Sequence, residues 1–225
     1  MTETVLAGIE LLPVAITPRQ LFILLHGFGT NAADMLPVAQ RFRMAYPDAA
    51  FLIPEGTYAL GDSLARRQWF DIEGIAETSR PARLAEAMPA LHALVQEAQN
   101  RLKILSSDTA LIGFSQGSIM ALEFSAAHDG SAGRILVFSG RYARLPEVAP
   151  ELTTIHLLHG EQDRVIPVEH AHAAYAALTA LQGDVTLDLV ADAGHEISES
   201  LLDKAIYRLQ TCVPLRSWKR ALDSA

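Results

Sequence analysis

A serine at position 115 stands in a setting that could make it a nucleophile. It is the middle residue of Gly113-Phe114-Ser115-Gln116-Gly117, which follows an apolar run and precedes a helical pattern. A tight strand-to-helix turn crowds the positions two before and two after the serine, so both need glycine. The turn also exposes the hydroxyl and directs a helix N-terminus, which stabilises negative charge, toward it. Such a short pattern also occurs by chance, but its place between strand and helix favours a nucleophile.

A serine hydroxyl becomes a good nucleophile only beside a general base that a third group orients. Asp163 and His195 each follow an apolar run further along the chain, in the order serine, acid, histidine. We expect His195 to take the proton of Ser115 and pass it to the leaving group, while Asp163 orients the imidazole. Glu161 is the nearest rival for the acid, and the alternative for Asp163 is a solvated loop or cap residue.

Acyl transfer from such a serine also needs hydrogen-bond donors for the oxyanion of the tetrahedral intermediate. One donor is the backbone N–H of the residue after the nucleophile, here Gln116. The second comes from a loop after an early strand, where His26-Gly27-Phe28-Gly29 follows an apolar run. We assign it to the N–H of Phe28. The alternative is that these glycines form only a tight turn.

These residues need a sheet whose strand ends converge, and the hydrophobic pattern predicts one. Short apolar runs alternate with helical patterns, which is typical of βαβ units and a mostly parallel sheet. The predicted strands are 21–25, 50–53, 109–112, 134–138, 154–158, 185–190 near a sheet edge, and an outer strand at 5–12. The predicted helices are 81–102, 116–128, 167–181 and 196–210, with 56–80 as a loop that shapes the site. The sequence therefore predicts one α/β domain over residues 1–225, with the α/β-hydrolase fold and helices on both faces of a mostly parallel central sheet.

Large apolar side chains near these motifs are candidates for the substrate pocket. Trp69 and Phe70 are plausible walls because apolar surface binds acyl chains, with burial in the core an equally good interpretation. The same reasoning makes Tyr142, Val165 and Ile166 weaker candidates, together with Phe28.

The composition limits the classes of partner. The chain has 225 residues and a formal net charge of −8, which disfavours nucleic acid and anionic membrane surfaces. No apolar run approaches the about 20 residues that span a bilayer, and the N-terminal residues lack the positive charge of a secretory signal. A single cysteine, Cys212, fits a reducing compartment. We therefore expect a cytoplasmic protein without a membrane span. The oligomeric state stays open, a homodimer included.

Neither a cofactor nor a metal is expected. The chain has no dinucleotide-binding or phosphate-binding glycine motif. His170 and His172 lie on opposite sides of a predicted helix, and no cysteine or carboxylate completes a zinc set with His156 and His159.

Several motifs occur in the order found in one known family. They are His26-Gly27-Phe28-Gly29 with Asp34, Trp69-Phe70-Asp71-Ile72, the elbow around Ser115, His159-Gly160 with Asp163, and Gly194-His195. The chain resembles the small carboxylesterase and acyl-protein thioesterase family, also called the phospholipase/carboxylesterase family, over nearly its whole length. Gly140-Arg141-Tyr142 and Arg67-Gln68-Trp69-Phe70 resemble a bacterial esterase branch of it. The resemblance implies a compact hydrolase with little or no lid that acts on acyl esters or thioesters.

Two positions depart from the family pattern. Phe28 stands where eukaryotic members usually carry leucine, a change that a backbone donor tolerates. Arg66-Arg67 before the tryptophan is the other departure, and it alters the chemistry expected near the pocket.

The sequence therefore predicts a metal-free serine carboxylesterase that hydrolyses small to medium acyl esters through an acyl-enzyme. The nearest alternative is a thioesterase that acts on acyl-CoA or acyl-protein with the same three residues. A lyase or transferase on this fold is a second alternative, because a fold does not fix the chemistry. A binding module without catalysis is the third.

Overall fold

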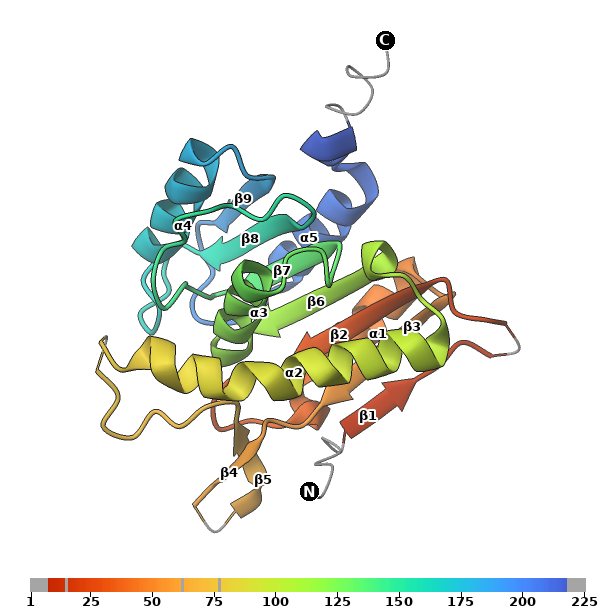
Figure 1. Ribbon diagram of the computed structural model, residues 1–225, viewed down its shortest axis with the longest axis horizontal. Helices are drawn as coiled ribbons and strands as arrows, with labels where there is room; N and C mark the ends of the chain where they lie inside the picture. The colour runs from red at the N-terminus through yellow and green to blue at the C-terminus, as the bar shows by residue number, and fades with distance from the viewer. Residues whose placement is uncertain (1–7, 15, 62, 77, 218–225) are drawn as a thin grey trace.

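The computed structural model describes residues 8–14, 16–61, 63–76 and 78–217 of the chain. Figure 1 shows its central feature, a twisted sheet with helices packed around it. The order of the strands in this sheet is β1-β3-β2-β6-β7-β8-β9. Their bounds are β1 Gly8–Leu11, β2 Gln20–Leu25, β3 Ala49–Pro54, β6 Thr109–Phe114, β7 Arg134–Phe138, β8 Thr154–Gly160 and β9 Val185–Val190.

All neighbouring strands in this sheet are parallel except β1, which pairs antiparallel with β3. The six predicted inner strands are confirmed, and the predicted outer strand is β1, with positions 5–7 outside the described residues. Strands β2 and β8 are buried along nearly their whole length, as apolar runs in a parallel sheet require. The more polar β9 forms an edge, as its alternating sequence predicts.

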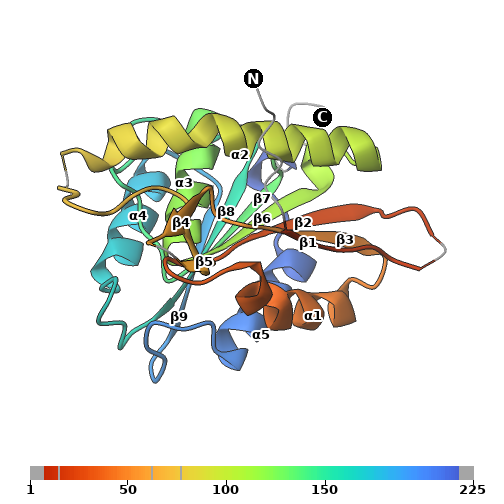
Figure 2. The ribbon, with the colours of Figure 1, turned by 90° about the horizontal axis from the view of Figure 1, so that it is seen from below.

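Helices cover both faces of the sheet, as expected. Their bounds are α1 Leu36–Ala45, α2 Arg80–Leu102, α3 Gln116–Ala127, α4 Glu169–Ala180 and α5 Glu199–Thr211. Figure 2 shows α1 and α5 together below the sheet, with α2 and α3 above it. The buried side chains divide in the same way, because one core cluster joins the sheet to α2, α3 and α4 and the other joins it to α1 and α5.

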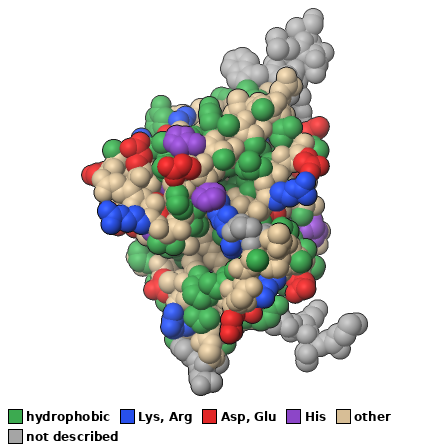
Figure 3. All heavy atoms as spheres, turned by 90° about the vertical axis from the view of Figure 1, so that its left-hand side faces the viewer, with side chains coloured by type: hydrophobic (Ala, Val, Ile, Leu, Met, Phe, Trp, Pro, Cys, Tyr) green, Lys and Arg blue, Asp and Glu red, His purple; other side chains and the backbone are tan. Residues whose placement is uncertain are grey.

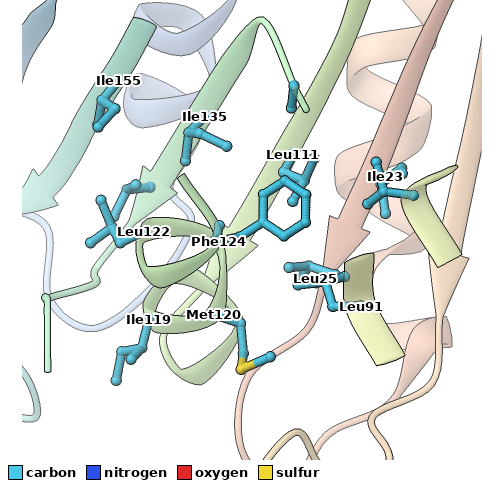
Figure 4. Packing of buried hydrophobic residues seen from close by; sticks show 14 of the residues in the cluster. Ile23, Leu25, Leu91, Leu111, Ile119, Met120, Leu122, Phe124, Ile135 and Ile155 are labelled. Carbon is cyan, nitrogen blue, oxygen red and sulfur yellow. The ribbon is translucent and has the colours of Figure 1, made fainter. Parts of the chain in front are cut away.

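Helix α3 is the centre of the first cluster and is buried on nearly every side, which its apolar sequence predicts. Figure 4 shows its side chains packed against the sheet, with Ile119, Met120, Leu122 and Phe124 beside strand residues that include Leu25, Leu111 and Ile135. This packing fixes α3, and with it the turn that precedes the helix, against the middle of the sheet.

Two parts of the structure differ from the sequence prediction. Residues 56–80 are not simply a loop, because β4 (Tyr58–Leu60) and β5 (Ser63–Gln68) form a separate antiparallel hairpin. The hairpin pairs with the loop after β2, since Gly29 N–H donates to Arg67 O and Arg67 N–H donates to Thr30 O, both at 2.9 Å. Helix α1 was also not predicted.

Candidate active site

Ser115 lies at the junction between a strand and a helix. Strand β6 ends one residue before it and α3 begins one residue after it. Ser115 itself has φ +52° and ψ −112°, a backbone conformation that side-chain-bearing residues rarely adopt. The sharp turn that the sequence predicts is therefore present, and it lies at the carboxyl ends of the parallel strands.

The two glycines of this turn occupy positions with no room for a side chain. A β-carbon at Gly113 would stand 2.5 Å from the main chain of Gly117, and one at Gly117 would stand 2.1 Å from Leu25 O. Neither distance is sterically possible, so the crowding expected on both sides of the serine accounts for both glycines.

Three side chains from distant parts of the chain meet at this turn. His195 Nε2 lies 2.9 Å from Ser115 Oγ, and His195 Nδ1 lies 2.7 Å from Asp163 Oδ2. The loop after β8 supplies Asp163 and the loop after β9 supplies His195. The Phe114 ring packs against the imidazole at a centroid distance of 5.1 Å. Glu161, the rival acid, is an exposed residue, so Asp163 is the carboxylate in contact with His195.

Asp163 is buried and held by the main chain of its own loop. Its side chain is 0% exposed, and Oδ1 accepts hydrogen bonds from the N–H groups of Val165 at 2.8 Å and Ile166 at 2.9 Å. Burial by itself raises the pKa of the carboxyl, but hydrogen bonds from His195, Ile166 and Val165 outweigh it and hold the pKa below its usual range. The group is therefore a carboxylate at neutral pH.

The backbone N–H groups of Gln116 and Phe28 have no protein acceptor within the described part of the chain. Gln116 begins α3, where the first N–H groups have no partner in the helix. The loop that contains Phe28 lies beside the serine, because a β-carbon at Gly27 would stand 3.5 Å from Ser115 Cβ. Both groups are thus free to donate to a molecule at Ser115.

His26 fixes the peptide that carries the Phe28 N–H. Its Nδ1 lies 2.7 Å from Gly27 O, which also accepts from Thr30 Oγ1 at 2.9 Å, while its Nε2 accepts from Gly56 N–H at 2.9 Å. These partners require a neutral ring with its proton on Nδ1, and burial lowers the pKa of His26 accordingly. Because a trans peptide is planar, holding Gly27 O directs the N–H of Phe28 the opposite way. Sequence reasoning did not assign this role, although His26 directly precedes the glycines.

The side chain of Gln116 joins the start of α3 to the segment after β5. Its Oε1 accepts from Trp69 N–H and its Nε2 donates to Phe70 O, both at 2.8 Å. Trp69 Nε1 donates to His26 O at 2.8 Å. Through residues 69–70, these contacts connect the start of α3 and the loop after β2, which carry the two free N–H groups.

The residues that the sequence predicts for the pocket differ in how far they are exposed in the structure. Trp69 and Phe70 are each 1% exposed and belong to the core, which is the alternative interpretation of their sequence. Tyr142 and Ile166 are also buried, while Val165 is 66% exposed. The contacts of Val165 and Ile166 with Asp163 are through main-chain N–H groups, which carry no sequence signal.

Phe28 borders a cavity of about 520 Å³ beside the β4–β5 hairpin. The other lining residues are Tyr58, Ala59, Leu60, Gly61, Gln68, Asp71, Ile72 and Glu73. Its volume is within the usual range for a small-molecule site. Figure 3 shows the face of the molecule that lies on the left in Figure 1, where hydrophobic, charged and histidine side chains are interspersed.

The described residues contain neither a cluster suited to a metal ion nor a helix suited to cross a membrane. No group of three or more His, Cys, Asp or Glu side chains there is arranged to hold a metal ion. None of the helices in that part of the chain has both the length and the hydrophobicity to span a membrane.

Comparison with known proteins gives consistent matches. Residues 13–213 match the phospholipase/carboxylesterase family. The chain is 43% identical to esterase YpfH of Escherichia coli (strain K12) over 91% of this chain and 88% of that protein. The crystal structure of esterase PE8 superimposes with a TM-score of 0.81 at 29% identity, covering 92% of this chain and 99% of that one. The Bacillus cereus carboxylesterase, at 18% identity, shares the fold with a TM-score of 0.76 over 91% of this chain and 93% of its own.

The parallel sheet, the helices on both faces and the serine at the strand-to-helix turn define an α/β-hydrolase. The chain belongs to the phospholipase/carboxylesterase family. It is a carboxylic ester hydrolase, and the resemblance to a bacterial esterase branch is confirmed.

Proposed function

We propose that the protein is a serine carboxylesterase that hydrolyses small to medium acyl esters through an acyl-enzyme, with Ser115, His195 and Asp163 as its catalytic triad. One observation carries this proposal: the imidazole of His195 contacts Ser115 Oγ at 2.9 Å through one nitrogen and Asp163 Oδ2 at 2.7 Å through the other. Such a bridge is the arrangement that lets a histidine act as base and then as acid.

In this mechanism Ser115 Oγ attacks the ester carbonyl carbon while His195 Nε2 takes the hydroxyl proton. The carbonyl oxygen becomes an oxyanion, which accepts from the N–H groups of Gln116 and Phe28. The C–O bond to the alcohol then breaks, and the alcohol leaves with the proton from His195. Water, deprotonated by His195, then attacks the acyl carbon. The bond from that carbon to Ser115 Oγ breaks, the carboxylic acid leaves, and Oγ takes the proton back from His195. Asp163 stays ionised and holds the imidazole throughout.

The size of the cavity beside Phe28 favours a substrate whose acyl or alcohol group is small to medium. Its volume is about 520 Å³, and Phe28, Tyr58, Leu60 and Ile72 give it apolar walls. Of the pocket residues predicted from sequence, Phe28 and the exposed Val165 are the ones with surface available to a substrate, whereas Trp69, Phe70, Tyr142 and Ile166 are buried in the core. Rates on a chain-length series of p-nitrophenyl esters are expected to peak at short or medium chains and fall with longer ones.

A fluorophosphonate probe tests the nucleophile directly. Wild-type protein should be labelled and should hydrolyse a short p-nitrophenyl ester, and Ser115→Ala should lose both properties. Ser131→Ala, which changes a serine in the loop between α3 and β7, is the matched control and should keep both. Labelling that persists in Ser115→Ala would exclude the proposed mechanism.

A further inference from the structure

A second histidine contacts the carboxylate of Asp163. His159 Nε2 lies 3.3 Å from Asp163 Oδ2, the same oxygen that accepts from His195 Nδ1 at 2.7 Å. Both the His159 and Asp163 side chains are almost completely buried, with 1% and 0% exposed. The carboxylate therefore lies between two imidazoles, of which only His195 reaches Ser115.

The contacts of His159 determine its protonation. Its Nε2 lies 2.8 Å from Ile166 O, which can only accept, so Nε2 carries a proton. Burial, the largest influence, lowers the pKa of His159, although the hydrogen bond to Ile166 and the charge of Asp163 act to raise it. The charged or titratable groups that influence it electrostatically are Asp163, His195 and His170 of α4. His159 is therefore a neutral donor at pH 7, and it adds no second positive charge beside Asp163.

His159 also begins a chain of hydrogen bonds that ends on the acid. It donates to Ile166 O at 2.8 Å, and Ile166 N–H donates to Asp163 Oδ1 at 2.9 Å. Since His159 lies at the end of β8, the chain ties the 163–166 turn to the sheet. Loss of His159 would remove the side-chain donor to Ile166 O and release the turn that holds Oδ1.

We propose that His159 is a positioning residue that keeps Asp163 aligned with His195 by holding the 163–166 turn. The proposal rests on the triad proposed above. When His195 becomes an imidazolium in the transition state, the carboxylate must remain ionised and in line with Nδ1. The turn that His159 holds serves both needs, because its Ile166 N–H orients Oδ1 of Asp163 and stabilises the charge of the carboxylate.

A matched pair of substitutions separates this role from a general packing role. In His159→Gln the side-chain amide nitrogen reaches the position of Nε2, whereas in His159→Asn the amide is too short to reach it. We expect His159→Asn to lose roughly 10- to 100-fold in kcat, with KM within about twofold of wild type. His159→Gln should recover most of that loss. With Asp163 less well aligned, it stabilises the His195 imidazolium less, so the acid limb of the kcat/KM profile of His159→Asn should also move to lower pH.

The concentration of active sites in each preparation is found by labelling to completion with the fluorophosphonate, and kcat is calculated per labelled site. Partly unfolded protein in a preparation is therefore not counted as lost catalysis. His156, also buried and on β8 but without a contact to Asp163 or His195 among the described residues, provides the control pair His156→Gln and His156→Asn. These should keep kcat per site and the pH profile.

Two results would overturn the proposal. One is a His159→Asn variant with wild-type kcat per site and an unmoved acid limb, and the other is a His159→Gln variant as impaired as His159→Asn. Failure of the triad itself would be seen separately, as activity that survives in Ser115→Ala or His195→Ala.

Discussion

The α-carbon of Gly117 lies so close to the carbonyl oxygen of Leu25 that a β-carbon on it would stand 2.1 Å from that oxygen. Both groups are main-chain, so neither can rotate away. Gly117→Ala should therefore lower the free energy of unfolding by at least about 3 kcal/mol or prevent folding. Gly74, with open space around it and φ +59°, is the control, and Gly74→Ala should cost about 1 kcal/mol. Urea unfolding measures both, and equal costs would show that the helix can shift away from the strand.

Replacing the acid tests the arrangement around His195. Asp163→Asn keeps the shape but can place an N–H against the histidine, which favours the wrong tautomer, so kcat should fall by roughly four orders of magnitude. Glu161→Gln, two residues away and exposed, should leave kcat unchanged. Steady-state kinetics on a p-nitrophenyl ester distinguishes them, and the opposite pattern would make Glu161 the acid.

Buried His156 should make the fold sensitive to acid. Burial lowers the pKa of His156 from 6.5 to about 3, and the charges of Arg134 and Arg208 act in the same direction. Between these two values the unfolded chain binds a proton that the folded protein does not, so the free energy of unfolding falls as pH falls through this window. The slope from this residue is up to about 1.4 kcal/mol per pH unit. Urea unfolding at several pH values should show a shallower slope for His156→Leu than for wild type. Parallel curves would contradict the prediction.

The charge of the chain should distinguish ester from acyl-CoA substrates. The protein has a formal net charge of −8, and coenzyme A is a polyanion, so the two repel each other at low salt. We expect kcat/KM for an acyl-CoA to rise with ionic strength as this repulsion is screened. The uncharged p-nitrophenyl ester of the same acyl chain is the control and should not respond. A fall with salt would instead indicate a basic site that recognises the coenzyme.

The parallel strands were predictable because the inner ones are short apolar runs and β9 alternates as an edge strand does. Their order in the sheet, which brings the loops of Ser115, Asp163 and His195 together, comes from the structure. Helix α1 was missed although Val38, Ala39 and Phe42 give it a buried face, because its 10 residues make only about three turns and so present a short pattern. The β4–β5 hairpin was missed for a different reason. Its polar residues Arg66-Arg67-Gln68 do not resemble a strand, and main-chain pairing with the loop after β2 holds it in place.

The site was predictable only where side-chain identity carries the chemistry. The donors to Asp163 from Val165 and Ile166 are main-chain N–H groups, which any residue would provide, so no sequence signal indicates them. The ambiguity over Trp69 and Phe70 was of a similar kind. Large apolar side chains serve equally well in a pocket or a core, and only the tertiary packing places these two inside.

The positive φ of Ser115 has a consequence for anyone who engineers this protein. Glycine adopts that backbone conformation without cost, whereas serine does not. Relaxing the turn by Ser115→Gly would therefore favour folding while it removes the hydroxyl. If heat-resistant variants are selected for stability alone, inactive sequences at position 115 will be selected. Such a selection therefore has to measure turnover as well as melting temperature.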